Sequence, residues 1–226
     1  MSGSGSGYYR SSATIPASEG LHSANTIHLW CQSTAVPSTA DLKAFVELVG
    51  GPSPAQNPHD QVYWNHTSGS FYKTRAHRNA AGSYVSAQLA STPAANTWHS
   101  WASTFDGTNA RSYLAGTLDG TSSGSGAAEA SQVYVDALAL IDYSGSYTAG
   151  SQFSDAQIAE LAIWNVALDT AEIAALAKGF RASMIRPSAL KFYAPVVRGL
   201  MDVRGGRTFT SIAGTDVSSD HPRVIG

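Results

Sequence analysis

The sequence predicts an all-β fold, and two observations support that prediction. Short runs rich in aromatic, β-branched and small residues alternate with turns that contain Gly or Pro along most of the chain. Charged residues make up only 13% of the 226 residues, about half the usual share of a soluble protein, and Ser, Thr, Ala and Gly take their place. A chain of this length can form one large β-sandwich, so we expect one sandwich domain with flanking segments.

The clearest strand signal is a hairpin centred on Asp106-Gly107, which lies between two strand-like runs and favours a tight turn. The first run alternates two sets of residues, Trp98, Ser100, Ala102 and Thr104 against His99, Trp101, Ser103 and Phe105. Aromatic residues occupy both sets, so we expect this strand to be covered on both faces. Gly116 is expected to end the second strand, before another turn at Asp119-Gly120.

Further strands are predicted from alternation and from β-favouring composition. They cover residues 26–32, 61–64, 70–77, 83–89, 133–142, 191–197 and 207–212. Residues 41–49 fit a helix and a strand equally well. Two Gly- and Ser-rich stretches, residues 121–130 and 143–150, are predicted to be loops.

One short helix is predicted at residues 170–178. Asp169 can cap its N-terminus, and Glu172 completes a capping box from the third helical position. Its apolar stripe consists of Ile173, Leu176, Ala177 and Phe180. Gly179 is expected to end the helix. Residues 154–165 carry both helix and strand signals, and we interpret residues 157–164 as a strand.

Three motifs resemble a known family. The hairpin reads Trp98-His99, then Thr104 to Thr108, then Arg111 to Gly116; a second motif spans residues 157–176, and a third is Thr26 to Trp30. Together they resemble laminin-G-like domains of the concanavalin A-like lectin/glucanase superfamily, across residues 20 to 180. The resemblance implies a concanavalin A-like jelly-roll β-sandwich and favours a strand at residues 41–49. Lectins, adhesion domains, glycosidases and virion proteins share this sandwich, so the resemblance predicts function poorly.

A weaker resemblance covers residues 177–225, which contain Ile185-Arg186-Pro187 and Asp220-His221-Pro222-Arg223. This arrangement resembles a tail that follows laminin-G-like domains in bacteriophage structural proteins and some environmental bacterial proteins. We therefore predict three parts of the chain. They are a flexible N-terminal arm at residues 1–20, the sandwich domain at residues 21–182 and a C-terminal extension at residues 183–226.

Composition argues against several classes of function. The net charge is −2 and the pI about 6.4, with no basic stripe, so nucleic acid is not an expected partner. No apolar run approaches the roughly 20 residues of a membrane helix, and the N-terminal residues lack the charged and apolar regions typical of a signal peptide. Cys31 is the single cysteine, which excludes a disulfide within one chain and predicts a small buried side chain in a strand.

Catalysis has no motif in the sequence. A glycosidase needs two carboxylates that flank the scissile bond, and glucanases of this superfamily carry a Glu-x-Asp-x-x-Glu strand. That spacing does not occur here, since the acidic residues are scattered singly. The seven histidines lack the spacing of a zinc site. We therefore predict a protein that is not an enzyme.

Calcium is the candidate ion, because some related domains bind it at the rim of a sheet through several oxygen ligands. The candidate ligands are Asp106, Asp119, Asp136, Asp142 and Asp155. Asp106 and Asp119 each precede a Gly and are explained more simply as turn residues. Asp142 and Asp155, which flank the loop at residues 143–150, are therefore the predicted metal ligands.

A sugar-binding site would need an aromatic platform with polar neighbours. Asp106, Tyr143 and Tyr147 are the predicted carbohydrate contacts, on a rim that also includes residues 121–126. The tryptophans Trp30, Trp98, Trp101 and Trp164 are instead expected in the core of the sandwich.

These observations predict a non-enzymatic virion structural protein of a bacteriophage, a capsid decoration protein or another surface protein that docks on a particle lattice. Its expected partners are other virion proteins and further copies of itself, and its expected location is the virion after synthesis in the host cytoplasm. The alternative is a carbohydrate-binding, lectin-like adhesin that contacts cell-surface glycans.

Overall fold

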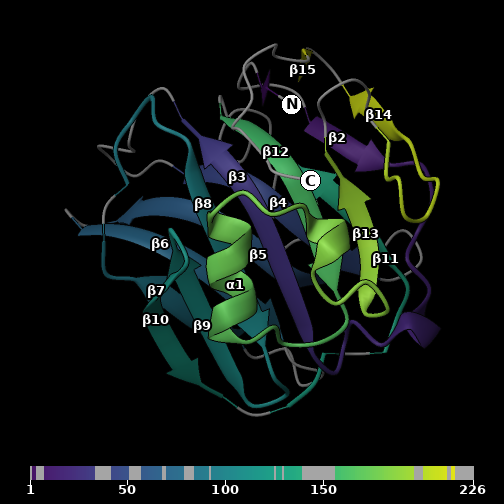
Figure 1. Cartoon of the computed structure of the whole chain (residues 1–226), viewed down its shortest axis with the longest axis horizontal. Helices are drawn as coiled ribbons and strands as arrows, with labels where there is room; N and C mark the ends of the chain where they lie inside the picture. Colours follow the sequence, from purple (N-terminus) through teal and green to yellow (C-terminus); the bar gives the residue numbers. More distant parts are fainter. Residues whose placement is uncertain are drawn as a thin grey trace.

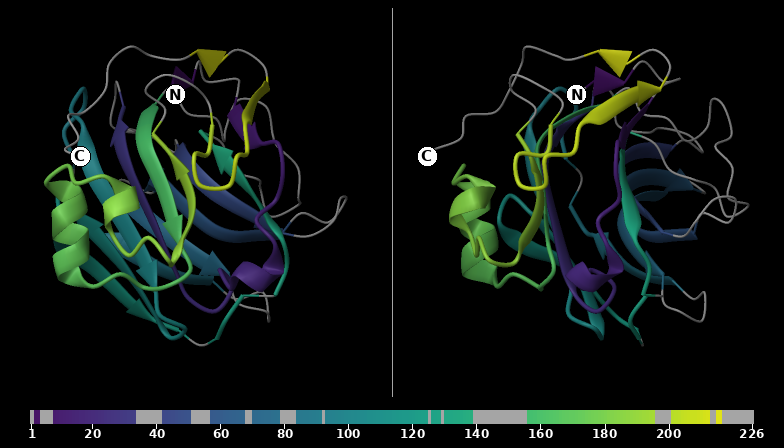
Figure 2. Two further views of the ribbon diagram at one scale, coloured as in Figure 1. Left: turned by 45° about the vertical axis from the view of Figure 1, so that its right-hand side comes forward. Right: turned by 90° about the vertical axis from the view of Figure 1, so that its right-hand side faces the viewer.

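Two antiparallel β-sheets pack face to face in this computed structural model (Figures 1 and 2). The structure describes residues 2–3, 8–33, 42–50, 57–67, 70–78, 84–91, 93–124, 126–128, 130–138, 156–195, 201–212 and 215–216. None of the helices in these ranges is long and apolar enough to cross a membrane. The predicted all-β sandwich with one short helix is confirmed.

The larger sheet has eight strands. In spatial order they are β10 (Thr117–Ser123), β9 (Asn109–Leu114), β8 (His99–Phe105), β3 (Asn25–Gln32), β12 (Gln157–Trp164), β1 (Ser2–Gly3) and β15 (Thr215–Asp216), and β13 (Leu190–Ala194) pairs with β12 beside β1. The other sheet has seven strands. Their order is β14 (Phe209–Ile212), β2 (Tyr8–Ser11), β11 (Val133–Ala137), β4 (Leu42–Gly50), β5 (Asn57–Thr67), β6 (Ser70–Arg78) and β7 (Tyr84–Leu89).

The main hydrophobic core lies between the two sheets. Phe45 of β4 meets Trp101 of β8 edge-to-face across this layer, with ring centroids 5.8 Å apart. Ile27, Leu29 and Cys31 alternate along β3 and are fully buried in the same core. Burial raises the pKa of the Cys31 thiol far above its usual range, so this cysteine is a neutral, inert core residue, as expected.

The hairpin predicted around Asp106-Gly107 is confirmed as β8 and β9. Asp106 accepts hydrogen bonds from the backbone N–H of Thr108 (3.0 Å) and Asn109 (2.7 Å), and Gly107 has a φ of 93°. β8 is buried on both faces: Trp101 lies in the core between the sheets and Ala102 in a second cluster on the outer face. Aromatic residues on both faces of one strand correctly predicted this burial.

Helix α1 (Thr170–Ala177) covers the outer face of the eight-stranded sheet (Figures 1 and 2). Its predicted capping box is present, since Asp169 accepts from the Glu172 N–H and Glu172 accepts from the Asp169 N–H. Ile173 and Leu176 are buried beneath it, whereas Phe180 is 38% exposed and does not continue the predicted stripe.

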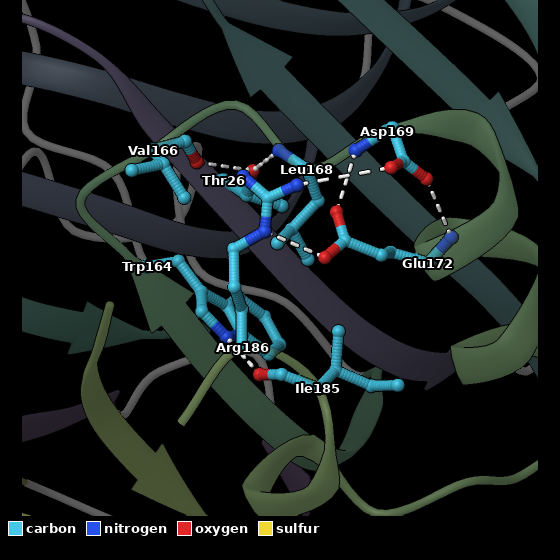
Figure 3. Close-up of polar contacts among 8 residues, drawn as sticks. All are labelled: Thr26, Trp164, Val166, Leu168, Asp169, Glu172, Ile185 and Arg186. Atoms are coloured by element: carbon cyan, nitrogen blue, oxygen red, sulfur yellow. Dashed lines mark hydrogen bonds and ion pairs between the residues drawn. The ribbon is translucent and has the colours of Figure 1, made fainter. Parts of the chain in front are cut away.

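Polar contacts hold the segments on either side of α1 against β3 and β12 (Figure 3). Thr26 of β3 donates its hydroxyl to the carbonyl of Val166 at 2.7 Å and accepts the N–H of Leu168 at 2.9 Å. Trp164 of β12, fully buried, donates its indole N–H to the carbonyl of Ile185 at 2.8 Å. These bonds satisfy buried polar groups and set the position of the helix over the sheet.

Of the four tryptophans expected in the core of the sandwich, only Trp101 lies between the two sheets, and Trp164 belongs to the cluster beneath α1. Trp101 and Trp164 are fully buried, while Trp30 and Trp98 are only partly buried. Trp30 lies on the outer face of the sheet, since its cross-strand partner Ser100 shares a face with Ala102 beneath α1. The alternation of β3 therefore takes Trp30 away from the core that receives Leu29 and Cys31.

The turn predicted at Asp119-Gly120 is wrong. Both residues belong to β10, where a bulge lies between Leu118 and Gly120, and the chain turns earlier, at Ala115-Gly116. The Asp119 carboxylate instead accepts the N–H and the hydroxyl of Ser91, both at 2.9 Å. A contact with a residue distant in sequence therefore replaces the local bond that Asp-Gly predicts.

The segments expected on either side of the sandwich both contribute strands to it. β2, inside residues 1–20, pairs with β11 and β14, and Tyr9 is buried in the core. β13 and β14 come from the segment that begins at residue 183. A short 3₁₀-helix, η2 (Ala182–Met184), precedes β13. The domain bounds at residues 20 and 182 stay a prediction.

Candidate functional site

Asp106 is the one predicted carbohydrate contact that the structure describes. Besides its two backbone bonds, its carboxylate receives the Arg111 guanidinium at 2.6 Å. Partial burial opposes ionisation, but these hydrogen bonds outweigh it and lower the pKa of Asp106 to about 2. Asp106 thus acts as a turn residue with an occupied carboxylate. The other predicted site residues, Asp142, Tyr143, Tyr147 and Asp155, lie outside the described residues.

Asp119 and Asp136, the other described candidates for calcium, are also occupied by protein partners. Asp119 bonds Ser91, and Asp136 forms a bidentate ion pair with Arg10, at 2.8 and 2.6 Å. Asp136 is completely buried, so this pair ties β2 to β11. Within the described ranges, no group of three or more His, Cys, Asp or Glu could hold a metal ion.

A buried polar cluster lies on the outer face of the larger sheet. Tyr193 of β13 donates its hydroxyl to Glu160 at 2.5 Å, and His28 of β3 contacts Ser100 at 3.1 Å. Burial lowers the pKa of His28 to about 3, so its ring is neutral. Glu160 has a φ of 52° at a bulge in β12. All four side chains are at most 5% exposed, so they do not present an open site.

An open cleft of about 220 Å³ lies between three segments that are far apart in sequence. The segments are η1 (Ala17–Glu19), the start of β13, and the turn between residues 201 and 208, which we call the arginine turn. Figure 1 shows the purple N-terminal segment, β13 and the yellow C-terminal segment close together on the right-hand side. The cleft is lined by Glu19, Leu190, Lys191, Arg204, Gly205 and Arg207.

Asp202 holds the arginine turn in shape. Its fully buried carboxylate accepts the N–H groups of Tyr193 (2.9 Å) and Arg204 (3.0 Å), and it pairs with the Arg207 guanidinium at 2.7 Å. Backbone bonds from Asp202 to Arg207 and from Gly206 to Asp202 close the turn. The two arginines therefore belong to a turn that hydrogen bonds to Asp202 hold in place.

Each cation of the cleft has at least one defined contact that sets its position. Lys191 forms an ion pair with Glu19, with 2.6 Å between Nζ and Oε2. Arg204 donates its Nε–H to the carbonyl of Leu190, and Arg207 donates its Nε–H to the carbonyl of Thr14, both at 3.1 Å. The site thus combines three basic groups with one carboxylate on its lining.

Sequence reasoning missed this cleft. A signal was present in Arg204-Gly205-Gly206-Arg207, where two arginines flank two small residues in a turn. The third cation, Lys191, and the carboxylate of Glu19 come from other segments, and only the fold brings them together. No local pattern in the sequence predicts that these residues lie close together.

Two antiparallel sheets packed face to face, with one short helix on an outer face, define a jelly-roll β-sandwich. The chain belongs to the concanavalin A-like lectin/glucanases superfamily, since a laminin-G family model of that description matches residues 5–174. The family resemblance seen in the sequence is thereby confirmed. No curated protein sequence is significantly similar to the chain.

Solved structures with a similar fold differ widely in sequence. A heptameric SAP-like pentraxin from Limulus polyphemus has a TM-score of 0.60 at 16% identity, over 92% of this chain and 86% of the pentraxin. A protein from Bacteroides ovatus described as carbohydrate-binding has a TM-score of 0.55 at 11% identity, over 93% of this chain and 58% of its own. The binding domain of botulinum neurotoxin serotype C1 has a TM-score of 0.51 at 13% identity, over 71% and 37% of the two chains. These identities establish a common fold alone.

Proposed function

We propose that this chain is a non-catalytic carbohydrate-binding module. Its superfamily includes lectins by name, and the Bacteroides ovatus protein with the same fold is described as carbohydrate-binding. The observation that carries the proposal is the open cleft, whose lining is rich in hydrogen-bond donors that suit sugar hydroxyls and acidic groups.

The chemistry of the described cleft favours binding over hydrolysis. A glycosidase uses two carboxyl groups on either side of the scissile bond. Among the described residues that line the cleft, Glu19 is the one carboxylate, and it is paired with Lys191. That arrangement supports recognition of a ligand and supplies no acid–base pair.

A glycan array probed with the purified chain tests the proposal. We expect binding that the free sugar displaces. Absence of binding to every glycan, both with calcium and with a chelator, would contradict the proposal. We further propose calcium at the loop flanked by Asp142 and Asp155. Loss of binding in chelator, reproduced by Asp142→Asn with calcium present, is the expected result for that part.

A second proposal concerns where the module works: on a phage particle, as a surface or decoration protein that docks on a lattice of virion proteins and copies of itself. It rests on the tail-like sequence at residues 177–225 and on the low charge of the chain. Truncation of either end is a poor test, because β2 and β14 pair with each other inside the sandwich.

Labelling is the better test of the virion proposal. An antibody raised against the purified chain should label intact particles of the phage in immuno-electron microscopy. Particles that stay unlabelled while the host lysate contains the chain would overturn the proposal. Sedimentation of the purified chain tests its predicted self-association, which should appear as a species larger than 23.6 kDa.

A further inference from the structure

We propose that the cleft between η1, β13 and the arginine turn is an anion-binding site, and that its ligand is an acidic saccharide carrying a carboxylate or sulfate group. The inference rests on the proposed carbohydrate-binding function. It adds the charge of the ligand and the residues that bind the charged group. Asp106 is not among the described residues that line this cleft.

The charges on the cleft lining favour an anion. Lys191, Arg204 and Arg207 contribute three positive charges. Glu19, paired with Lys191, and the buried Asp202, paired with Arg207, contribute two negative charges, so one positive charge is left in excess. The protein as a whole has a net charge of −2, whereas the cleft has an excess of positive charge. A local excess of cations in a concave site raises the concentration of an anionic ligand there.

The two arginines are positioned so that their ends remain available. Arg204 is fixed through Nε, and among the described residues its two terminal nitrogens have no hydrogen-bond partner. Arg207 uses Nε and Nη1 for Thr14 and Asp202, so only its Nη2 has no hydrogen-bond partner in the described part of the chain. A guanidinium with free terminal nitrogens can bind a carboxylate or sulfate through two parallel hydrogen bonds.

The arginine side chains are held in place before the ligand binds, which lowers the entropic cost of binding. The side chain of Arg207 is only 14% exposed, and the buried carboxylate of Asp202 holds both this side chain and the backbone beneath Arg204. Because less side-chain freedom is lost when the ligand arrives, more of the interaction energy contributes to affinity.

Gly205 is required by the packing of the turn. A Cβ at this position would lie 1.8 Å from Nη1 of Arg207 and 2.5 Å from Oδ2 of Asp202. Any side chain would therefore displace the Arg207–Asp202 pair. Because Gly205 has no side chain, a ligand can approach the backbone of the turn between the two arginines.

The volume of the cleft limits the ligand. About 220 Å³ is below the roughly 300–1,000 Å³ of pockets that enclose a drug-sized molecule. The cleft thus suits one charged sugar unit, with the rest of a polysaccharide lying outside it.

An NMR titration of the full chain tests the inference. The ¹⁵N-labelled protein is titrated with sodium glucuronate, glucose 6-sulfate, glucose and sodium sulfate. We expect both acidic sugars to shift the Nε–Hε signals of Arg204 and Arg207, and glucose to leave them unchanged. Arg204→Gln should weaken acidic-sugar binding roughly tenfold or more, because a charge-assisted pair of hydrogen bonds is lost.

Two further variants give opposite expectations. Lys178→Gln removes one positive charge from the exposed end of α1, outside the cleft, and should leave the affinity unchanged. Glu19→Gln removes the carboxylate that pairs with Lys191 and should tighten binding severalfold. Thermal melting of each variant verifies that it is folded.

The results separate this inference from the proposed function. Acidic-sugar binding that Arg204→Gln leaves intact, or that Lys178→Gln weakens equally, would overturn the cleft as the site while the carbohydrate-binding function stands. Binding of inorganic sulfate without either acidic sugar would overturn the saccharide as ligand. Binding of neutral glycans on the array, with no acidic sugar bound in the titration, would overturn the inference and leave the function intact.

Discussion

Gly116 is the residue on which the close approach of α1 to the sheet depends. It has a φ of 82°, and a Cβ there would lie 2.9 Å from the Cβ of Ala177 and 3.1 Å from the Cα of Ala174. Gly116→Ala should therefore add backbone strain and push the helix outward. We expect a loss of about 2–4 kcal/mol in the free energy of unfolding, measured by urea denaturation.

Gly206→Ala is the matched control for that substitution. Gly206 has a similar φ of 69°, but a Cβ there meets nothing within 4 Å. Only the backbone strain remains, so the expected loss is about 1 kcal/mol. Equal losses at the two positions would show that helix contact contributes nothing to the requirement for glycine at Gly116.

Asp106 gives the hairpin a pH dependence. Its pKa is lowered from 3.8 to about 2 in the folded chain, so its contribution to stability is complete above about pH 4. That contribution is lost as the pH falls towards 2. Asp106→Asn should lower the free energy of unfolding by about 1 kcal/mol at pH 7, a modest value because the carboxylate is partly exposed.

Urea denaturation of both proteins between pH 7 and pH 2 measures this effect. The difference between wild type and Asp106→Asn should shrink steadily below pH 4. A difference that stays constant down to pH 2 would mean that the Arg111 and backbone contacts do not stabilise the ionised form.

At the scale of the element, α1 is stabilised at its start by a network of charged groups (Figure 3). Asp169 and Glu172 cap each other's backbone N–H groups, and Arg186 donates to Glu172 at 2.6 Å from the segment that follows the helix. Glu172→Ala removes both the reciprocal cap and the ion pair. We expect a loss of about 1–2 kcal/mol in urea denaturation.

Glu172→Gln separates the two contributions. Glutamine can still accept the Asp169 N–H, so the capping box remains and only the charge opposite Arg186 is removed. Since Arg186 is 42% exposed, that ion pair is screened by solvent and should contribute under about 1 kcal/mol. A loss as large as that of Glu172→Ala would assign the stabilisation to Arg186 and not to the cap.

Elements that depend on neighbouring residues were predictable from the sequence, and elements that depend on distant ones were not. The capping box and the Asp106-Gly107 hairpin are local patterns, and both appear where predicted. β10 was predicted as a turn and a loop, because Asp119-Gly120 is a local turn signal. In the structure Asp119 bonds Ser91, 28 residues away, and no local pattern predicts that contact. β2 looked like a flexible arm, since Arg10 pairs with Asp136, which is 126 residues away, and with Thr210 near the other end of the chain.

The candidate site was less predictable than the fold for the same reason. The cleft unites Glu19, Lys191 and Arg204, which are separated by up to 185 residues (204 − 19). Each is an ordinary surface charge in its own segment. The sequence pattern instead indicated Asp106 as a sugar contact, and its carboxylate proves to be occupied by its own turn. The predicted metal ligands Asp142 and Asp155 lie outside the described residues.

At the scale of the whole molecule, the two ends of the chain close the sandwich together. β2 pairs with β14 in one sheet, and β1 pairs with β15 in the other (Figure 2). The buried ion pair of Arg10 with Asp136 adds a charged contact to the same corner. We expect pairing between residues some 200 positions apart to form late in folding, because a long loop must close first.

Phe209 tests whether this closing segment is one cooperative unit with the sandwich or a separate extension. Its ring is 6% exposed and meets Phe192 of β13 edge-to-face, with centroids 5.6 Å apart. Phe209→Ala should cost about 3–5 kcal/mol and shift a single unfolding transition, because the cavity opens in the shared core. Met201→Ala, 46% exposed at the start of the arginine turn, should change the transition by under about 0.5 kcal/mol. If Phe209→Ala instead left the main transition in place and produced a separate early step, the C-terminal segment would be an independent extension. The two arginines of the cleft belong to that segment, so the cleft would then fold and unfold independently of the sheets.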